Sequence, residues 1–270
     1  MGTLILNELY VCINKKTIYI WLLIQFVILC PIYFVYSSSS SEGIEATTLE
    51  AALNVFGGLS KKHTILSLAF WLSIIVMLMI ISYNITNVLY GFDVMLITRC
   101  GSKTKWWLSK VIAIIIINVI YSLVVIVSTK AISIIFLKNV DQLSPYSQIY
   151  YEHIYESSIS PVYLKICVIA ILITGFMAIN TLFQNFNIIF FNSSKAYVCA
   201  LIVSIFLLAL YSKGAIPRWM SPLNYPSILD LDGDKDIYLH SIIFNLVLTL
   251  FNIIIGLIII NRKDYKSLHN

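Results

Sequence analysis

The feature that most constrains this 270-residue chain is a series of long apolar runs without a charged residue. A helix needs about 20 apolar residues to cross a hydrocarbon core of about 30 Å. Five uncharged runs reach or approach that length, at 17–36, 64–92, 111–129, 166–194 and 241–261, and a shorter run covers 196–212. Only 11% of the residues are charged, against roughly 25% in a soluble domain. The sequence therefore predicts an all-α membrane protein.

The runs on either side of Lys195 indicate two helices, because Lys195 is the only charge between residues 166 and 212. Small polar residues gather just before it and predict a tight turn; they are Asn185, Asn187, Asn192, Ser193 and Ser194. We therefore expect six spans in one transmembrane domain, 1–270. The expected spans are about 17–36, 64–88, 111–130, 164–186, 196–213 and 238–260.

The distribution of cations predicts the orientation of the spans. With the N-terminus inside, the inner segments carry ten cations and three acids, and the outer segments carry eight cations and ten acids. The inner cations lie close to the helix ends, where the positive-inside rule is strongest. We expect both termini in the cytoplasm. The Ile, Asn, Lys and Tyr content suggests a bacterial cell membrane.

The first apolar run and the cysteines are also compatible with a bacterial membrane protein. The first apolar run has 20 residues, which exceeds the 7–15 of a signal-peptide core and predicts an uncleaved helix. The five cysteines form no C-x-x-C pair and predict no disulfide framework.

Three shorter elements are expected outside the spans. Apolar residues at helical spacing predict an interfacial helix within residues 1–16, with a frayed terminus as the alternative. Thr48 and the residues after it predict a brief outer helix that ends at Gly57. Three prolines, Trp219 and Tyr225 predict a re-entrant outer segment before the last span.

Two acidic patterns could bind a metal, and both favour a plainer interpretation. His153 and Glu156 lie at i, i+3, but two ligands are weak evidence and a wet helical face is the default. The alternating aspartates at 230–236 lack the terminal Glu of a calcium loop, so a solvated acidic turn is favoured. We expect no metal site.

The segment 91–110 carries the most informative polar pattern. Gly91 permits a bend, Asp93 is placed to cap a short helix, and four cations follow within "RCGSKTKWWLSK" (99–110) with no acid among them. Such cations could only orient the loop and hold anionic lipids. Alternatively, they could belong to a cytoplasmic coupling helix that docks into a partner. Nucleic-acid binding is a weaker option, because the patch is short and held at a membrane.

The whole pattern resembles a permease subunit of an ABC-2 type transporter. Six spans, an interfacial N-terminal helix and the stretch "YGFDVMLITRCGSKTKWWLSK" (90–110) are similar to that family's architecture and first intracellular loop. By position, the resemblance assigns ATPase coupling to this loop, at Asp93, Arg99, Ser102, Lys103, Lys105, Trp106 and Lys110. The family's opening acid is usually Glu, whereas this chain has Asp93. "IPRWMSPLNY" (216–225) resembles the family's re-entrant segment.

The resemblance implies partners and a cargo. The chain contains no P-loop motif, so the ATPase, with its ATP and Mg²⁺, is expected on a separate chain, and this chain is expected to bind no cofactor and to be no enzyme itself. A second permease, identical or paralogous, is implied, together with the lipid bilayer and no nucleic acid. The expected cargo is an amphipathic peptide or a lipid-like molecule. Peptide export from a Gram-positive cell is the favoured setting.

Uncharged polar residues inside the expected spans form a second candidate site. They are Asn118, Tyr121, Asn180, Gln184, Asn245 and Asn252. Amides in lipid usually form hydrogen bonds between helices, and that packing role is favoured over lining a substrate path.

Two other function classes are compatible with a polytopic membrane chain. An intramembrane enzyme would need paired catalytic groups at membrane depth, whereas the chain has no H-E-x-x-H and its acids avoid the runs. A stand-alone immunity or sensor module that binds a peptide without ATP is the main alternative.

Overall fold

The computed structural model describes residues 2–12, 15–57, 65–86, 102–140, 142–155, 159–190, 193–228 and 235–262. These residues form helices and short connecting segments, with one isolated parallel β-bridge between Thr47 and Lys138.

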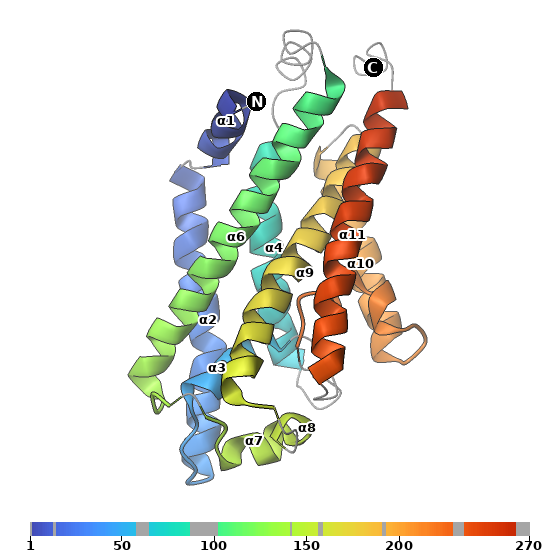
Figure 1. Ribbon diagram of the computed structural model, residues 1–270. Helices are drawn as coiled ribbons and strands as arrows, with labels where there is room; N and C mark the ends of the chain where they lie inside the picture. The colour runs from blue at the N-terminus through green and yellow to red at the C-terminus, as the bar shows by residue number, and fades with distance from the viewer. Residues whose placement is uncertain are drawn as a thin grey trace.

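Long helices form the body of the molecule (Figure 1). Five are long and apolar enough to cross a membrane: α2 (Lys15–Ser41), α6 (Lys103–Phe136), α9 (Pro161–Phe190), α10 (Ser193–Ser212) and α11 (Lys235–Arg262). A further helix, α4 (Ile65–Thr86), lies among them and contacts α2, α6 and α9. Its apolar stretch with described side chains, Ala69–Tyr83, is shorter than the other five. Five long apolar helices are thus established, and the role of α4 as a sixth span stays a prediction.

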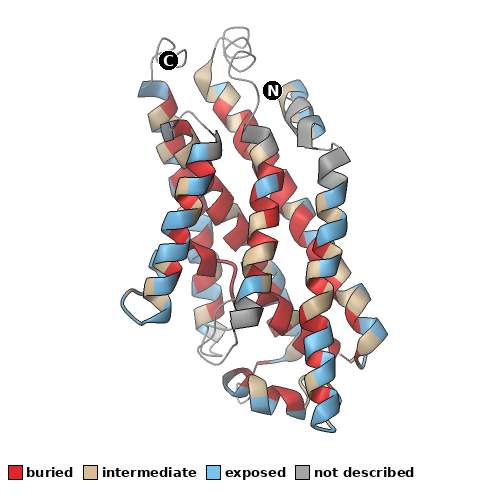
Figure 2. Cartoon of the chain, turned by 180° about the vertical axis from the view of Figure 1, so that it is seen from behind, coloured by how far each residue is buried: buried red, intermediate tan, exposed pale blue. Residues whose placement is uncertain are grey.

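The burial pattern is that of a protein surrounded by lipid. Helix α9 lies at the centre, with Ile171, Leu172 and Phe176 fully buried. Large apolar side chains nevertheless cover the outside of the bundle, and on α11 Leu250 and Phe251 are 61% and 57% exposed. Exposed positions line the outward faces of the helices in Figure 2. A soluble protein rarely exposes apolar patches of that extent, so the outward face is a membrane-embedded surface.

The two ends of the bundle differ. Helix α1 (Gly2–Cys12) and the C-terminal end of α11 lie at one end, which we call the terminal end (Figure 1). Three short helices lie at the opposite end, which we call the cap end: α3 (Thr48–Phe56), α7 (Pro145–Tyr150) and α8 (Glu152–Tyr155).

Several sequence-based expectations are confirmed. Residues 2–12 form a helix, and α3 is the predicted brief helix, with its cap at Thr47 and its end at Gly57. The predicted break between two helices is confirmed, but α9 continues through Asn185 and Asn187 to Phe190 and α10 already begins at Ser193, so the break is shorter than predicted. The described cysteines, Cys30, Cys167 and Cys199, are free thiols.

The helices extend beyond the apolar runs. Helix α6 begins eight residues before Val111 and ends at Phe136, and α2 continues through five serines to Ser41. A helix can continue beyond the hydrocarbon core of the bilayer, because lysine and serine are also compatible with helical backbone and their polar groups can reach the interface. Residues 91–101, with Asp93 and Arg99, lie outside the described part of the chain, as do Glu156 and the aspartates at 230–234.

Candidate functional site

The basic segment predicted for coupling becomes the first turns of α6. Ser102 is the N-cap residue: its backbone is extended, and its hydroxyl accepts a hydrogen bond from the Lys105 amide at 3.3 Å. Capping satisfies an amide that would otherwise lack a partner at a helix start. The cations that follow are therefore fixed to a continuous helix of 34 residues. We call residues 102–110 the basic helix start.

The basic helix start separates an exposed cation from a buried one. Lys105 is exposed, whereas Lys110 is only 1% exposed. The Lys110 ammonium lies 5.2 Å from the centroid of the Trp106 ring. A cation over an aromatic face is stabilised by the ring quadrupole, which offsets part of the lost hydration. Lys105 can meet a partner in water, and Lys110 contributes to holding the helix in the bundle.

Trp107 attaches the basic helix start to α11. Its indole Nε1 donates a hydrogen bond to the Ile253 carbonyl oxygen at 3.3 Å. The ring packs where α11 has Gly256; a Cβ there would lie 2.7 Å from both Trp107 Cε2 and Asn185 Oδ1. A small apolar cluster surrounds the ring, formed by Trp107, Val111, Ile188 and Ile260. Three long helices, α6, α9 and α11, are thereby tied together near the terminal end.

The polar residues predicted inside the spans fall into two groups, and the first joins α4, α6 and α9. The Asn180 amide donates to Ser82 Oγ at 2.9 Å and to Asn118 Oδ1. Nearby, the Tyr121 hydroxyl donates to the Ile74 carbonyl oxygen at 2.6 Å. Each of these hydrogen bonds joins two different helices.

The second group joins α11 to α9 and to the segment before α11. Asn252 donates to the Ala178 carbonyl oxygen at 3.3 Å, and Asn245 donates to the Tyr225 carbonyl oxygen at 3.0 Å. Gln184 is buried on α9, and its Oε1 has no hydrogen-bond partner among the described residues.

The burial of these side chains bears on their role. All six candidate path residues are between 0 and 2% exposed. Within one chain they pack helices together, as amides in lipid usually do. A role in lining a substrate path stays a prediction that would require the helices to separate.

The segment after α10 enters the bundle without a continuous helix. It contains two short 3₁₀ helices, Arg218–Met220 and Pro222–Asn224, and every residue from Ser221 to Ile228 is buried. Pro226 lies against Gly175, where a Cβ would come within 2.7 Å of the proline Cβ. Gly175 is 14 residues into α9, or about 21 Å along its axis. The segment thus reaches about half-way along the bundle.

Side chains satisfy much of this irregular backbone. The Arg218 guanidinium donates to the carbonyl oxygens of Asn224 at 3.0 Å and Ser227 at 2.7 Å, and Trp71 Nε1 donates to the Leu223 carbonyl oxygen at 3.2 Å. Non-helical backbone at membrane depth is tolerated only where protein or water satisfies it. These bonds satisfy three backbone carbonyl groups of the segment, whereas the buried side-chain amide of Asn224 has no hydrogen-bond partner among the described residues; a re-entrant role stays a prediction.

A buried carboxylate organises the cap end, and sequence reasoning missed it. Glu50 of α3 is 0% exposed. Its oxygens accept hydrogen bonds from five donors: the amides of Thr47, Ser144 and Ser147 and the hydroxyls of Ser144 and Ser147. The T-x-x-E capping box at 47–50 was the available signal. The two serines, almost a hundred residues later, gave none.

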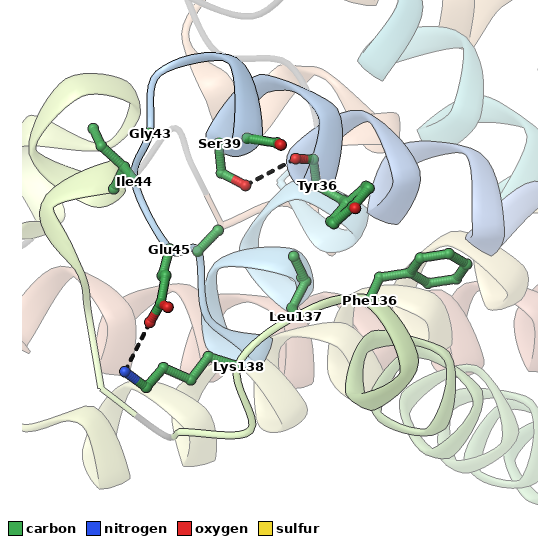
Figure 3. Close-up of a pocket in the computed structure, with 10 residues that line it drawn as sticks. Tyr36, Ser39, Gly43, Ile44, Glu45, Phe136, Leu137 and Lys138 are labelled. Atoms are coloured by element: carbon green, nitrogen blue, oxygen red, sulfur yellow. Dashed lines mark hydrogen bonds and ion pairs between the residues drawn. The ribbon is translucent and has the colours of Figure 1, made fainter.

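An open cavity of about 540 Å³ also lies at the cap end (Figure 3). Its lining includes Tyr36, Ser39, Phe136 and the ion pair of Glu45 with Lys138, whose Oε2 and Nζ are 2.8 Å apart. The Lys138 hydrogen bond and charge lower the pKa of Glu45, and Glu45 in turn raises the pKa of Lys138. Both side chains are exposed, so this pair fixes the local geometry more than the fold.

Fold and burial together define the chain as an all-α, multi-pass membrane protein. Within the described residues, no group of three or more His, Cys, Asp or Glu is placed to hold a metal ion. No protein-family profile, curated protein or solved structure matches the chain.

Proposed function

We propose that this chain is the membrane-spanning permease subunit of an ATP-driven transporter of the ABC-2 type, with the terminal end in the cytoplasm of a bacterial cell. A separate ATPase chain would bind ATP and Mg²⁺, and a second permease would complete the pathway. Helix α4 would be the sixth span, and residues 213–228 would re-enter from the outer side.

The main support for the proposal is that α6 is a single continuous helix whose start carries the basic residues. One unbroken helix joins the basic helix start to the cap end over 34 residues, or about 50 Å. Its start is capped by Ser102 and tied to α11 through Trp107. A load applied by an ATPase at residues 102–105 would therefore move a rigid element, as transmission between subunits requires.

The proposed cargo follows from the character of the bundle interior. Apart from Glu50 near the cap end and Lys110 near the terminal end, the buried polar side chains of the described residues are uncharged amides and hydroxyls among Ile, Phe and Tyr side chains. Such a surface favours an amphipathic peptide or a lipid-like molecule over an ion, because a buried ion would need compensating charges. Export is proposed from the family resemblance.

The test is co-purification from native cells. The tagged chain, extracted in mild detergent, is expected to retain a stoichiometric P-loop ATPase. In Lys103→Glu/Lys105→Glu, the amount of co-purified ATPase is expected to fall at least tenfold. The control is Lys213→Glu, which changes an exposed cation directly after the end of α10 and should leave the ATPase bound. Retention in the double variant would contradict the coupling role.

The stand-alone immunity or sensor module is the second candidate, and the open cavity at the cap end favours it. It predicts a preparation without any ATPase that still protects cells or binds peptide. In that case the Lys103→Glu/Lys105→Glu variant would also keep its activity.

A further inference from the structure

An apolar cleft lies between α3, α6 and α9, away from both candidate sites. Its volume is about 260 Å³, and its walls are mostly hydrophobic. The apolar residues of its lining are Leu49, Ala52, Phe56, Ile126, Val168 and Ile169. Ile169, which belongs to its lining, is 38% exposed, so the cleft opens onto the outer, lipid-facing surface of the bundle.

Two lysines stand on the cap side of this cleft. Lys130 of α6 lies six residues before the end of its helix, and Lys165 of α9 lies four residues after the start of its helix. Both are therefore about 6–9 Å from their helix ends, the depth at which lipid headgroups meet the hydrocarbon. Among the described residues that line the cleft there is no carboxylate. Lys130 Nζ donates to Thr48 Oγ1 at 2.8 Å, which places its ammonium at the cleft.

The apolar part lies one helical turn deeper than the charges. Ile126 is four residues from Lys130, and Ile169 is four residues from Lys165, so each pair shares a helix face. Helix α3 has the same gradient: Thr48 lies beside the lysine, and Ala52 and Phe56 follow at i+4 and i+8. On both long helices, α6 and α9, the lining thus changes from charged to apolar in the same direction, away from the cap end.

We propose that this cleft binds one anionic phospholipid of the leaflet at the cap end. Its phosphate pairs with Lys130 and Lys165, and part of one acyl chain fills the space beside Ile126, Val168 and Ile169. The volume is below the ~300–1,000 Å³ of sites that enclose a drug-sized ligand. Only a segment of chain therefore enters, and the remainder stays in the bilayer.

This site does not depend on the proposed transport function. The bound lipid would brace α3 against α6 and α9, the helices that carry the cap and the bundle centre. A permease and a stand-alone module would both retain it.

The test is native mass spectrometry of the delipidated full chain, titrated with palmitoyl-oleoyl phosphatidylglycerol or with the matched phosphatidylcholine. Phosphatidylglycerol is expected to bind one high-affinity site and phosphatidylcholine to bind it at least fivefold more weakly. Lys130→Gln/Lys165→Gln should weaken phosphatidylglycerol binding about 30-fold, a factor of about five per lysine. The control Lys195→Gln/Lys213→Gln removes two exposed cations outside the cleft and should leave binding unchanged.

A second variant tests the apolar half. Ala52→Phe fills the cleft and should weaken phosphatidylglycerol binding at least fivefold, because each displaced methylene contributes a factor of about four. If the Lys130 variant fails to fold, Lys165→Gln alone should lower the affinity about fivefold. Equal affinity for the two lipids, or loss in the lysine variants without any loss in Ala52→Phe, would overturn the cleft as a phospholipid site.

Discussion

At the scale of single residues, Glu50 shows how a charge is kept inside a largely apolar molecule. An ionised carboxylate without partners is strongly disfavoured in such surroundings. Five hydrogen-bond donors surround Glu50, and most of them belong to the start of α7 or to its cap residue. Backbone amides at a helix start also present a favourable dipole to an anion. The result is a rigid joint between α3 and α7.

Glu50→Gln tests that joint. A glutamine presents one NH₂ group to donors that need an acceptor, so the free energy of unfolding should fall by about 3 kcal/mol. We expect a thermal midpoint in detergent lower by roughly 5–10 °C. The control is Glu45→Gln, which alters an exposed ion pair nearby and should leave the midpoint unchanged. Equal midpoints for the two variants would mean that the buried carboxylate does not stabilise the cap.

Near the terminal end, Gly256 leaves the space that the Trp107 ring occupies. Gly256→Ala places a methyl group against the Trp107 ring and should destabilise the chain by about 1–3 kcal/mol. The measurement is the thermal midpoint in detergent. Gly2→Ala, whose added Cβ meets nothing within 4 Å, is the control.

A double variant identifies the cause. If the Trp107 ring is what the methyl meets, Gly256→Ala/Trp107→Leu should be less destabilised than the sum of its single variants. Additive losses of thermal stability would show that the strain at Gly256 arises elsewhere.

At the scale of elements, the sequence predicts the long helices and the short helices α1 and α3, but it does not predict how α7 and α8 are placed. Apolar runs near 20 residues have one good solution in lipid, so α2, α6, α9, α10 and α11 could be expected. Helices α7 and α8 are short, polar and rich in tyrosine; a solvated helical face was expected around His153, but the sequence did not mark α7. Their positions depend on Glu50 and Tyr146, which make contacts over long sequence distances.

The same distinction applies to the candidate sites. The cation Lys105 could be recognised because charge is a local property of the chain, whereas Ser102 was named only through the family resemblance and its capping role was not predicted. The pairing of Asn180 with Ser82 and Asn118 could not be recognised, because it depends on which helix faces meet. The glycine contacts were also hidden, since an isolated glycine in an apolar run does not reveal what approaches it.

Gly175 governs the depth of the segment before α11. In Gly175→Ala, the new methyl group would overlap Pro226, so the segment should shift toward the cap end. A cysteine at Ser221, in a chain whose native cysteines are replaced, is buried and should resist a membrane-impermeant maleimide. We expect the label to react at least tenfold faster in the Gly175→Ala background. Equal rates would indicate that the segment keeps its depth.

The cap should respond to alkaline pH. Burial raises the pKa of Tyr146 to about 12, and burial also raises the pKa of Tyr151. A folded-state pKa above the unfolded value of about 10 gives stability that is complete below about pH 10 and is lost as the pH rises through about 12. Limited proteolysis of the 137–160 region should accelerate over that window. Tyr146→Phe should reduce the pH dependence, and an unchanged profile would assign it to other groups.

At the scale of the whole molecule, α1 and the end of α11 lie at the same end of the bundle, opposite the cap (Figure 1). That arrangement fits an even number of crossings, with α4 as the sixth. We expect cysteines introduced at Gly2 and at Arg262 to be labelled from one side of intact cells or vesicles. A cysteine at Gln148, an exposed position of α7, should be labelled from the other side. Labelling of Gly2 and Arg262 from opposite sides would exclude six spans.

The Glu50 joint also has a consequence for the order of biosynthesis. Its serine partners follow it by 94 and 97 residues. At about 5–20 residues per second, they leave the ribosome about 5–20 s after α3. During that interval Glu50 has only its own capping partner, so α3 cannot settle into its final place. The cap closes only after α6 has been inserted, and a nascent chain that stops before Ser144 presents an open joint that quality-control proteases can recognise.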